Sequence, residues 1–186
     1  MDVIAHFYNQ RPDAVMCVKE RPWQGLYADG ITTLDYERGK ASHILAEPWQ
    51  TDDSIGSWGY NENTPYTTSD AVVDKLIDIV SKNGNLLLNI PLHPNGSIDE
   101  QEQDILKGLG QWVAINGDGL YGTRPWAIFG EGPSLRKKAA AHRFGGIADV
   151  EAFRPGDIRF VCKGDTELFA FLMAWPQTGE ITVRSL

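Results

Sequence analysis

The chain has 186 residues, of which 42% are hydrophobic and 23% are charged, and its 25 acidic and 17 basic side chains give a net charge of −8. These proportions are ordinary for a globular protein and exclude a disordered, collagen-like or coiled-coil chain. The acidic balance makes nucleic acid and anionic lipid poor partners, and the sequence has no apolar run of about 18 residues to span a membrane. No signal-peptide pattern is visible at the start, so the compartment is not predicted.

The first quarter of the chain gives few clear elements. Residues 2–9 read as a helix, and the apolar run 14–18 reads as a short strand buried on both faces. Residues 20–47 have no sustained period and are predicted to be a long loop. Cys17 and Cys162 lack the spacing of a zinc site or a disulfide framework, and we expect each to be a buried thiol on a strand.

The middle of the chain is more regular. Apolar residues recur at helical spacing after the N-capping sequence 67–70, and an Asn-Gly stop follows at 83–84. Residues 86–90 then form an apolar strand, with a further possible strand near 49–51. A capping box at 97–100 begins a second helix that ends near 116. The order strand, helix, strand, helix is typical of a parallel sheet covered by helices.

The last part changes character. Three β patterns at 157–162, 167–173 and 180–184 alternate with turn sequences, which predicts antiparallel strands. We therefore predict an α/β fold: a partial (β/α)8-like barrel followed by a small antiparallel β domain. The predicted division is 1–125 for the α/β part, 126–149 for a connector and 150–186 for the β-strand domain. A complete barrel needs about 250 residues, so this chain would hold only part of one.

Several motifs in series resemble the α-L-fucosidases of glycoside hydrolase family 29. The resemblance covers nearly the whole chain and keeps the order and spacing of the family. The matching segments are Leu34-Asp35-Tyr36-Glu37-Arg38-Gly39, residues 48–60, 80–90 and 115–126, and the tail segments 157–160 and 174–176.

The resemblance implies the second part of a catalytic barrel and the start of a β-sandwich. The family's nucleophile is an aspartate in a Trp-Phe-Asp-like stretch upstream of the region around Glu37, and no such stretch occurs here. Retaining glycoside hydrolysis needs two carboxyl groups about 5–5.5 Å apart, one as nucleophile and one as general acid/base. The implied protein is therefore a retaining α-L-fucosidase, present as a fragment that lacks the nucleophile and is inactive alone.

Glu37 matches the position where the family carries the acid/base, and we expect it to be that catalytic residue. From the residues alone, the expectation would be a solvated ion pair with Arg38, and the catalytic role is what the resemblance implies. Glu47 is the competing candidate for the acid/base. Asp35 is expected to be a turn or hydrogen-bonding residue.

Two residues are expected to bind substrate. Lys19 follows the first strand and would lie at the carboxyl-end rim, where barrel sites lie and where the family often has a cation. Trp58 could form an apolar wall for the C6 methyl group of fucose, or could be a core residue. The remaining candidates are expected to be structural: Trp49 packs in the core, Asn89 holds loop backbone, His93 is solvated, and Asp70, Asp74 and Asp78 form a solvated helix face.

The resemblance implies a fucosylated glycan or glycoconjugate as substrate, without a metal or organic cofactor, because two carboxyl groups suffice. Full-length relatives are often secreted, periplasmic or lysosomal. The alternative is a non-catalytic carbohydrate-binding or relic protein derived from a glycoside hydrolase, and a transfucosylase would share the same residues. Linkage preference and oligomeric state are not predicted.

Overall fold

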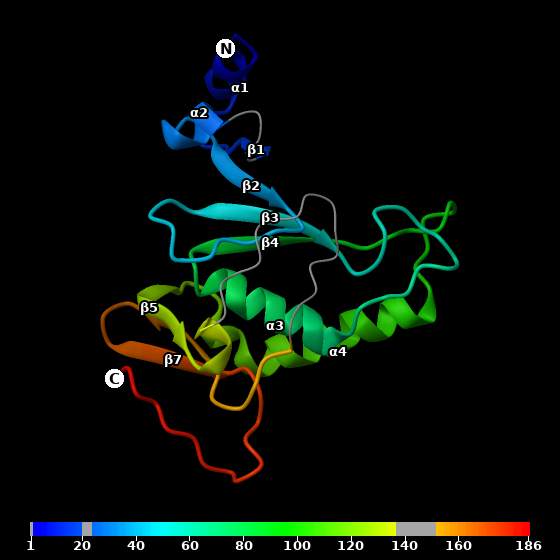
Figure 1. Ribbon diagram of the computed structural model, residues 1–186. Coiled ribbons are helices and arrows are strands. Elements are labelled where there is room, and N and C mark those ends of the chain that lie inside the picture. The colour runs from blue at the N-terminus through cyan, green and yellow to red at the C-terminus, as the bar shows by residue number, and fades with distance from the viewer. Residues whose placement is uncertain (1, 20–23, 137–151) are drawn as a thin grey trace.

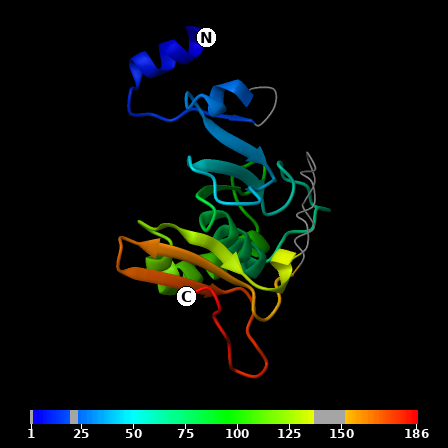
Figure 2. The same cartoon turned by 60° about the vertical axis from the view of Figure 1, so that its left-hand side comes forward.

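A computed structural model describes residues 2–19, 24–136 and 152–186. Two β-sheets enclose a layer of helices (Figures 1 and 2). The helices are α1 (Asp2–Gln10), α2 (Gln24–Ala28), α3 (Ser69–Val80) and α4 (Glu100–Asn116), of which α3 and α4 form the enclosed layer (Figure 1), with 3-10 turns η1 (Gly117–Gly119) and η2 (Pro133–Arg136). The strands are β1 (Cys17–Lys19), β2 (Thr33–Glu37), β3 (Trp49–Ser54), β4 (Gly84–Asn89), β5 (Arg124–Glu131), β6 (Ile158–Lys163) and β7 (Glu167–Leu172).

Strands β1 to β4 form a parallel sheet in the order of the chain. This confirms the α/β class and the separate antiparallel sheet. In the described residues the parallel sheet is open, with β1 and β4 at its edges. The partial-barrel architecture and the division at 125 and 149 stay predictions, and residues 137–149 of the expected connector lie outside the described residues.

The core of this half lies between the parallel sheet and α3. Trp49 is completely buried there against Ile79, and its indole nitrogen donates to the carbonyl of Lys82 at 2.8 Å. A Cβ atom at Gly84 would lie 2.5 Å from the Trp49 ring, so the first residue of β4 has room for no side chain. The prediction that Trp49 is a core residue is confirmed.

Helices α3 and α4 begin where their side chains cap them. The Thr68 hydroxyl accepts from the backbone nitrogen of Ala71 and caps α3. The N-cap of α4 is Asp99, whose carboxylate and the Glu102 carboxylate accept from each other's backbone nitrogens at 2.8 Å. The capping box predicted at 97–100 is therefore wrong by two residues, and its Ser97 precedes the helix.

The antiparallel sheet packs on the other side of the helices. Its central strand β6 is buried from Ile158 to Cys162, and Met173 and Phe171 pack against α3 and α4. Two of the predicted strands, β6 and β7, are confirmed. The strand predicted at 180–184 is wrong, because those residues have no strand pairing, and β5 is the third strand instead.

The N-terminal part differs most from expectation. The predicted loop 20–47 holds α2 and β2 in its described residues. Cys17 is exposed, so its predicted burial is wrong, whereas Cys162 is buried as expected. Helix α1 buries none of its residues and stands apart from the sheets (Figures 1 and 2), joined by a hydrogen bond from the Tyr8 hydroxyl to the Ile31 carbonyl. Within the described ranges, no helix has the length and apolar character to cross a bilayer.

Candidate active site

The carboxyl ends of the four parallel strands meet at one edge of the sheet. The last residues of β1 to β4 are Lys19, Glu37, Ser54 and Asn89. In parallel α/β sheets, sites form at this edge because the loops that follow the strands converge there. The structure thus brings the predicted residues Lys19 and Glu37 to one edge, and the loop after β3 adds Trp58.

The face of the parallel sheet that is turned away from α3 is polar, and we call it the open face. Successive strand residues alternate between faces, so Asp35 and Glu37 share this face with Lys19 and with Asp52, the register partner of Glu37. The Lys19 ammonium lies 2.9 Å from Asp35 Oδ2 and 2.5 Å from Asp52 Oδ1. Burial alone would lower the pKa of Lys19, but its hydrogen bonds to Asp52 and Asp35 raise that pKa above its ordinary value.

Asp52 and Asp53 show how the alternation sorts neighbouring carboxylates. Asp52 lies on the open face and binds Lys19, whereas Asp53 lies on the helix-facing side and binds Lys75 of α3. Sequence reasoning did not single out either residue. An Asp-Asp pair at the end of a predicted strand is a signal that could have found them, because one of the two must face each side of the sheet.

Glu37 is half-buried at the end of β2. Among the described residues, no hydrogen bond or ion pair reaches its carboxylate. The ion pair with Arg38 that the sequence allowed does not form, since the Arg38 guanidinium turns to the helix-facing side of the sheet. There it donates to the Gly56 carbonyl at 2.9 Å and lies 3.9 Å from Asp53. The carboxyl group of Glu37 is therefore not paired with a cation among the described residues.

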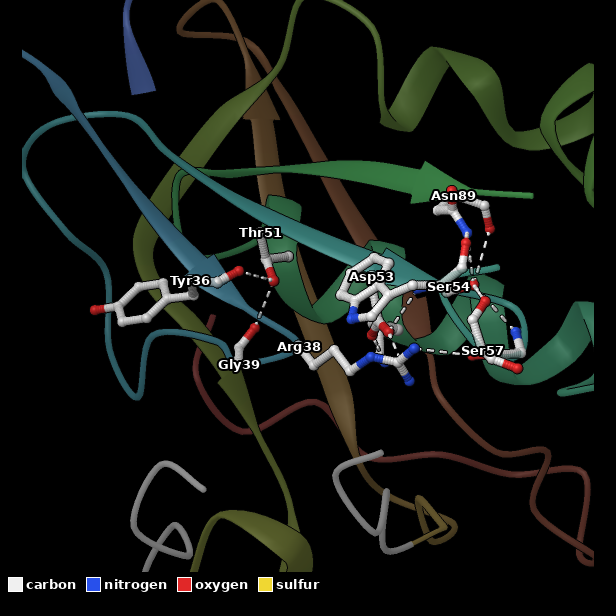
Figure 3. Close-up of polar contacts among 11 residues, drawn as sticks. Tyr36, Arg38, Gly39, Thr51, Asp53, Ser54, Ser57 and Asn89 are labelled. Atoms are coloured by element: carbon white, nitrogen blue, oxygen red, sulfur yellow. Dashed lines mark hydrogen bonds and ion pairs between the residues drawn. The ribbon is translucent and has the colours of Figure 1, made fainter. Parts of the chain in front are cut away.

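The backbone after Glu37 is held by a buried threonine. Arg38 has a φ of 53°, a left-handed conformation that residues with a side chain seldom adopt. The Thr51 hydroxyl lies 2.9 Å from the Tyr36 carbonyl and 2.8 Å from the Gly39 carbonyl, and so bridges the two ends of this turn (Figure 3). The turn that carries Glu37 and Arg38 is thereby fixed to β3.

The loop after β3 is fixed to the end of β4. The Asn89 amide donates to the Ser54 hydroxyl at 2.9 Å and to the Trp58 carbonyl at 3.1 Å, which confirms that Asn89 holds loop backbone. His93 is half-buried with its ring centroid 3.9 Å from that of Tyr60, so the prediction of a solvated histidine is wrong. Trp58 itself is 41% exposed, so it is not the core residue that the sequence left open.

Glu47, the competing acid/base candidate, lies elsewhere. It is exposed in the connection that enters β3, two residues before Trp49. That position is at the amino end of the strand, whereas Glu37 is at the carboxyl end of its neighbour. In the parts of the chain that the structure describes, no group of three or more His, Cys, Asp or Glu side chains is placed to hold a metal ion.

Comparison with known proteins identifies the family. A sequence profile described as Alpha-L-fucosidase matches residues 1–118. The chain belongs to the alpha-L-fucosidase family. It is 30% identical over 186 residues to the plasma alpha-L-fucosidase of Pongo abelii and 25% identical over 192 residues to the tissue alpha-L-fucosidase of Rattus norvegicus. The resemblance drawn from the motifs is therefore confirmed.

Solved structures of the family agree with this placement. An alpha-L-fucosidase at 27% identity has a TM-score of 0.68, and the Thermotoga maritima alpha-fucosidase in complex with fucose has 25% identity and a TM-score of 0.62. Each alignment covers 95% of this chain and 35% of the other. The alignments with the Pongo and Rattus proteins include 96% and 99% of this chain but only 36% and 37% of those proteins. The chain therefore spans about a third of the length of these relatives.

Proposed function

We propose that this chain supplies the acid/base side of the active site of a retaining α-L-fucosidase, with the nucleophile contributed by residues outside it. Family membership supports the reaction class. The observation that carries the assignment is the position of Glu37 at the carboxyl edge, on the open face, without a cation partner among the described residues. Asp35 and Asp52, which share that face, are both bound to Lys19.

In this mechanism Glu37 acts twice. It first donates a proton to the glycosidic oxygen while the nucleophile attacks the anomeric carbon, and it then removes a proton from the water that hydrolyses the covalent intermediate. The substrate is a terminal α-L-fucosyl group of a glycan or glycoconjugate. Glu47 is the weaker candidate because it lies at the amino end of β3.

Lys19 and Trp58 contact the sugar in this proposal. The Lys19 side chain is 34% exposed, so its ammonium can donate to a sugar hydroxyl or to the nucleophile while Asp35 and Asp52 hold it in place. The exposed ring of Trp58 offers an apolar surface for the C6 methyl group, which distinguishes fucose from sugars that carry a hydroxyl at that carbon.

Two experiments test the proposal. Purified chain is first incubated with an aryl α-L-fucoside, and no turnover is expected because one carboxyl group of the pair is missing. Turnover that Glu37→Gln leaves unchanged would overturn the assignment. Binding of fucose with no turnover by the chain and none by the chimera described below would favour the alternative, a non-catalytic carbohydrate-binding protein.

The second experiment supplies the missing part. A chimera in which this chain replaces the matching third of the Pongo abelii plasma alpha-L-fucosidase is compared with its Glu37→Gln variant. Loss of the general acid should slow substrates with poor leaving groups about 10²–10⁴-fold, and substrates with good leaving groups much less. Glu47→Gln is the matched control and should leave both rates within about twofold. The reverse pattern would assign the acid/base to Glu47.

A further inference from the structure

The Arg38 guanidinium lies over the indole ring of Trp58, a residue that is partly exposed to solvent. The carbon at the centre of the Arg38 guanidinium lies 4.5 Å from the centroid of the ring. Arg38 is buried, with 8% of its surface exposed, whereas Trp58 is 41% exposed. The pair therefore consists of a buried cation behind an exposed aromatic ring.

The guanidinium is fixed more firmly than a cation–π contact alone requires. It donates to the Gly56 carbonyl at 2.9 Å and lies 3.9 Å from Asp53, which is itself held by Lys75. The left-handed backbone at Arg38 sends its side chain to the helix-facing side directly after Glu37. Figure 3 shows Arg38 extending from the end of β2 toward Asp53.

The backbone of Trp58 is anchored independently. Its carbonyl accepts from Asn89 at 3.1 Å, and the carbonyl of the preceding Ser57 accepts from the Ser54 hydroxyl at 2.7 Å. These bonds fix the main chain but leave the torsions of the indole free. Among the described residues, the cation–π contact with Arg38 is the polar contact that bears on the ring.

We propose that Arg38 is a positioning residue that holds the Trp58 indole flat at the carboxyl edge, so that its open face is ready for a sugar. Only a planar guanidinium can stack on a ring and bind a carbonyl and a carboxylate at once, which the compact lysine ammonium cannot do. A ring held in place before binding loses less side-chain entropy when the sugar arrives. The part concerning the sugar rests on the proposed function, whereas the part concerning the ring does not.

The ring's position is tested in the full chain without sugar. Trp58→Phe assigns the Trp58 indole signal in a ¹H–¹⁵N spectrum, and the same spectrum contains the signal of buried Trp49, which reports on the fold. Arg38→Lys should shift or broaden the Trp58 signal and leave that of Trp49 in place. Arg124→Lys, at an exposed arginine that binds Asp165, is the matched control. An unchanged Trp58 signal in Arg38→Lys overturns the proposal. If Arg38→Lys also loses the Trp49 signal, Arg38→Met, which keeps the length of the side chain but has no planar group and no donor, takes its place, and an unchanged Trp58 signal in that variant overturns the proposal.

The consequence for sugar recognition is tested with L-fucose and L-galactose, which differ at C6 by a methyl against a hydroxymethyl group. The preference of the wild-type chain for L-fucose, followed at the Trp58 signal, should fall about threefold in Arg38→Lys, as expected for the loss of one cation–π contact. An equal loss of affinity for both sugars would show a merely structural role and overturn the proposal. If neither sugar moves the Trp58 signal of the wild-type chain, the proposed sugar site fails, and the sugar-free spectra still decide the role of Arg38.

Discussion

The carboxylate of Asp78 in α3 and the guanidinium of Arg159 in β6 meet at 2.7 Å, although the two residues are 81 positions apart in the sequence. Asp78 is 1% exposed and also binds Lys40 at 2.6 Å and Lys82 at 2.8 Å. Burial would raise the pKa of Asp78, but the three cations hold it well below its usual range. One carboxylate thus joins the helix layer, the antiparallel sheet and the segment that follows Glu37.

Asp78→Asn should destabilise the chain strongly, because three cations lose their shared carboxylate. Breaking a buried ion pair from one side costs about 3–5 kcal/mol, and we expect that loss in urea unfolding at pH 7. The stability that Asp78 contributes is complete above its unfolded pKa near 4 and is lost as the pH falls toward its lower folded pKa. The difference in free energy of unfolding between the wild type and Asp78→Asn should therefore become smaller in acid. Asp104→Asn, in an exposed pair with Lys107, should change stability by less than about 1 kcal/mol. Equal losses of stability in Asp78→Asn and Asp104→Asn would contradict the role of Asp78.

Asp74→Asn should stabilise the chain at neutral pH. Burial, together with the charges of Asp70 and Asp78, raises the pKa of Asp74 to about 6. The folded state then binds a proton more readily than the unfolded state, so stability falls as the pH rises from about 4 to about 6. The variant escapes this loss and should gain about 1 kcal/mol at pH 7, a figure reduced because the carboxyl is half exposed, with no gain at pH 4.

The control for this prediction is one turn earlier. Asp70 is exposed in the first turn of α3, where a negative charge is favourable at the helix N-terminus. Asp70→Asn removes this favourable charge but also removes one cause of the raised pKa of Asp74, so the two effects oppose each other and the net change in stability at pH 7 should stay within a few tenths of a kcal/mol. Gains of similar size from both variants would indicate general charge repulsion in this acidic chain instead of a local effect at Asp74.

Asp99→Ala should cost about 1–2 kcal/mol, because Asp99 caps α4 and also accepts from the Tyr66 hydroxyl at 3.0 Å. Ser97→Ala, at the residue where the sequence predicted the cap, should change stability by less than about 0.5 kcal/mol. Ser97 is exposed, and within the described ranges its hydroxyl bonds only to Asn95. Thermal unfolding of the two variants distinguishes the positions, and a larger loss from Ser97→Ala would contradict the observed helix start.

The elements predicted from sequence are those with an unambiguous apolar period. Helix α3 buries Val73 and Ile77 one turn apart, and β4 is a short apolar run between turn signals. Strand β2 was missed because its sequence, Thr-Leu-Asp-Tyr-Glu, places Asp35 and Glu37 on the open face, where a buried parallel strand would have apolar residues. The same polar residues that make this strand part of the candidate site prevented its prediction from the sequence.

The wrong interpretation of Asp78 has a different cause. Asp70, Asp74 and Asp78 repeat at four-residue spacing, which on a lone helix indicates a solvated stripe. Their spacing carries no information about Arg159, which reaches Asp78 only when the antiparallel sheet packs on α3. Likewise, the motifs made Glu37 and Trp58 candidate site residues, but the left-handed turn that directs the Arg38 side chain away from that of Glu37 had no signal in the sequence.

The turn at Arg38 leads to a prediction at Thr51, which is buried and bridges the carbonyls of Tyr36 and Gly39. Thr51→Val keeps the shape and removes the hydroxyl, which should cost about 1–3 kcal/mol because two partly buried carbonyls lose the donor that they share. Thr51→Ser keeps the hydroxyl and removes only a methyl group. If the bridge positions the turn, the Trp58 indole signal should move in the valine variant and stay in the serine variant, since Arg38 transmits the position of the turn to the ring. Equal movement in both variants would show that packing of the methyl group, and not the hydrogen bonds, holds the turn.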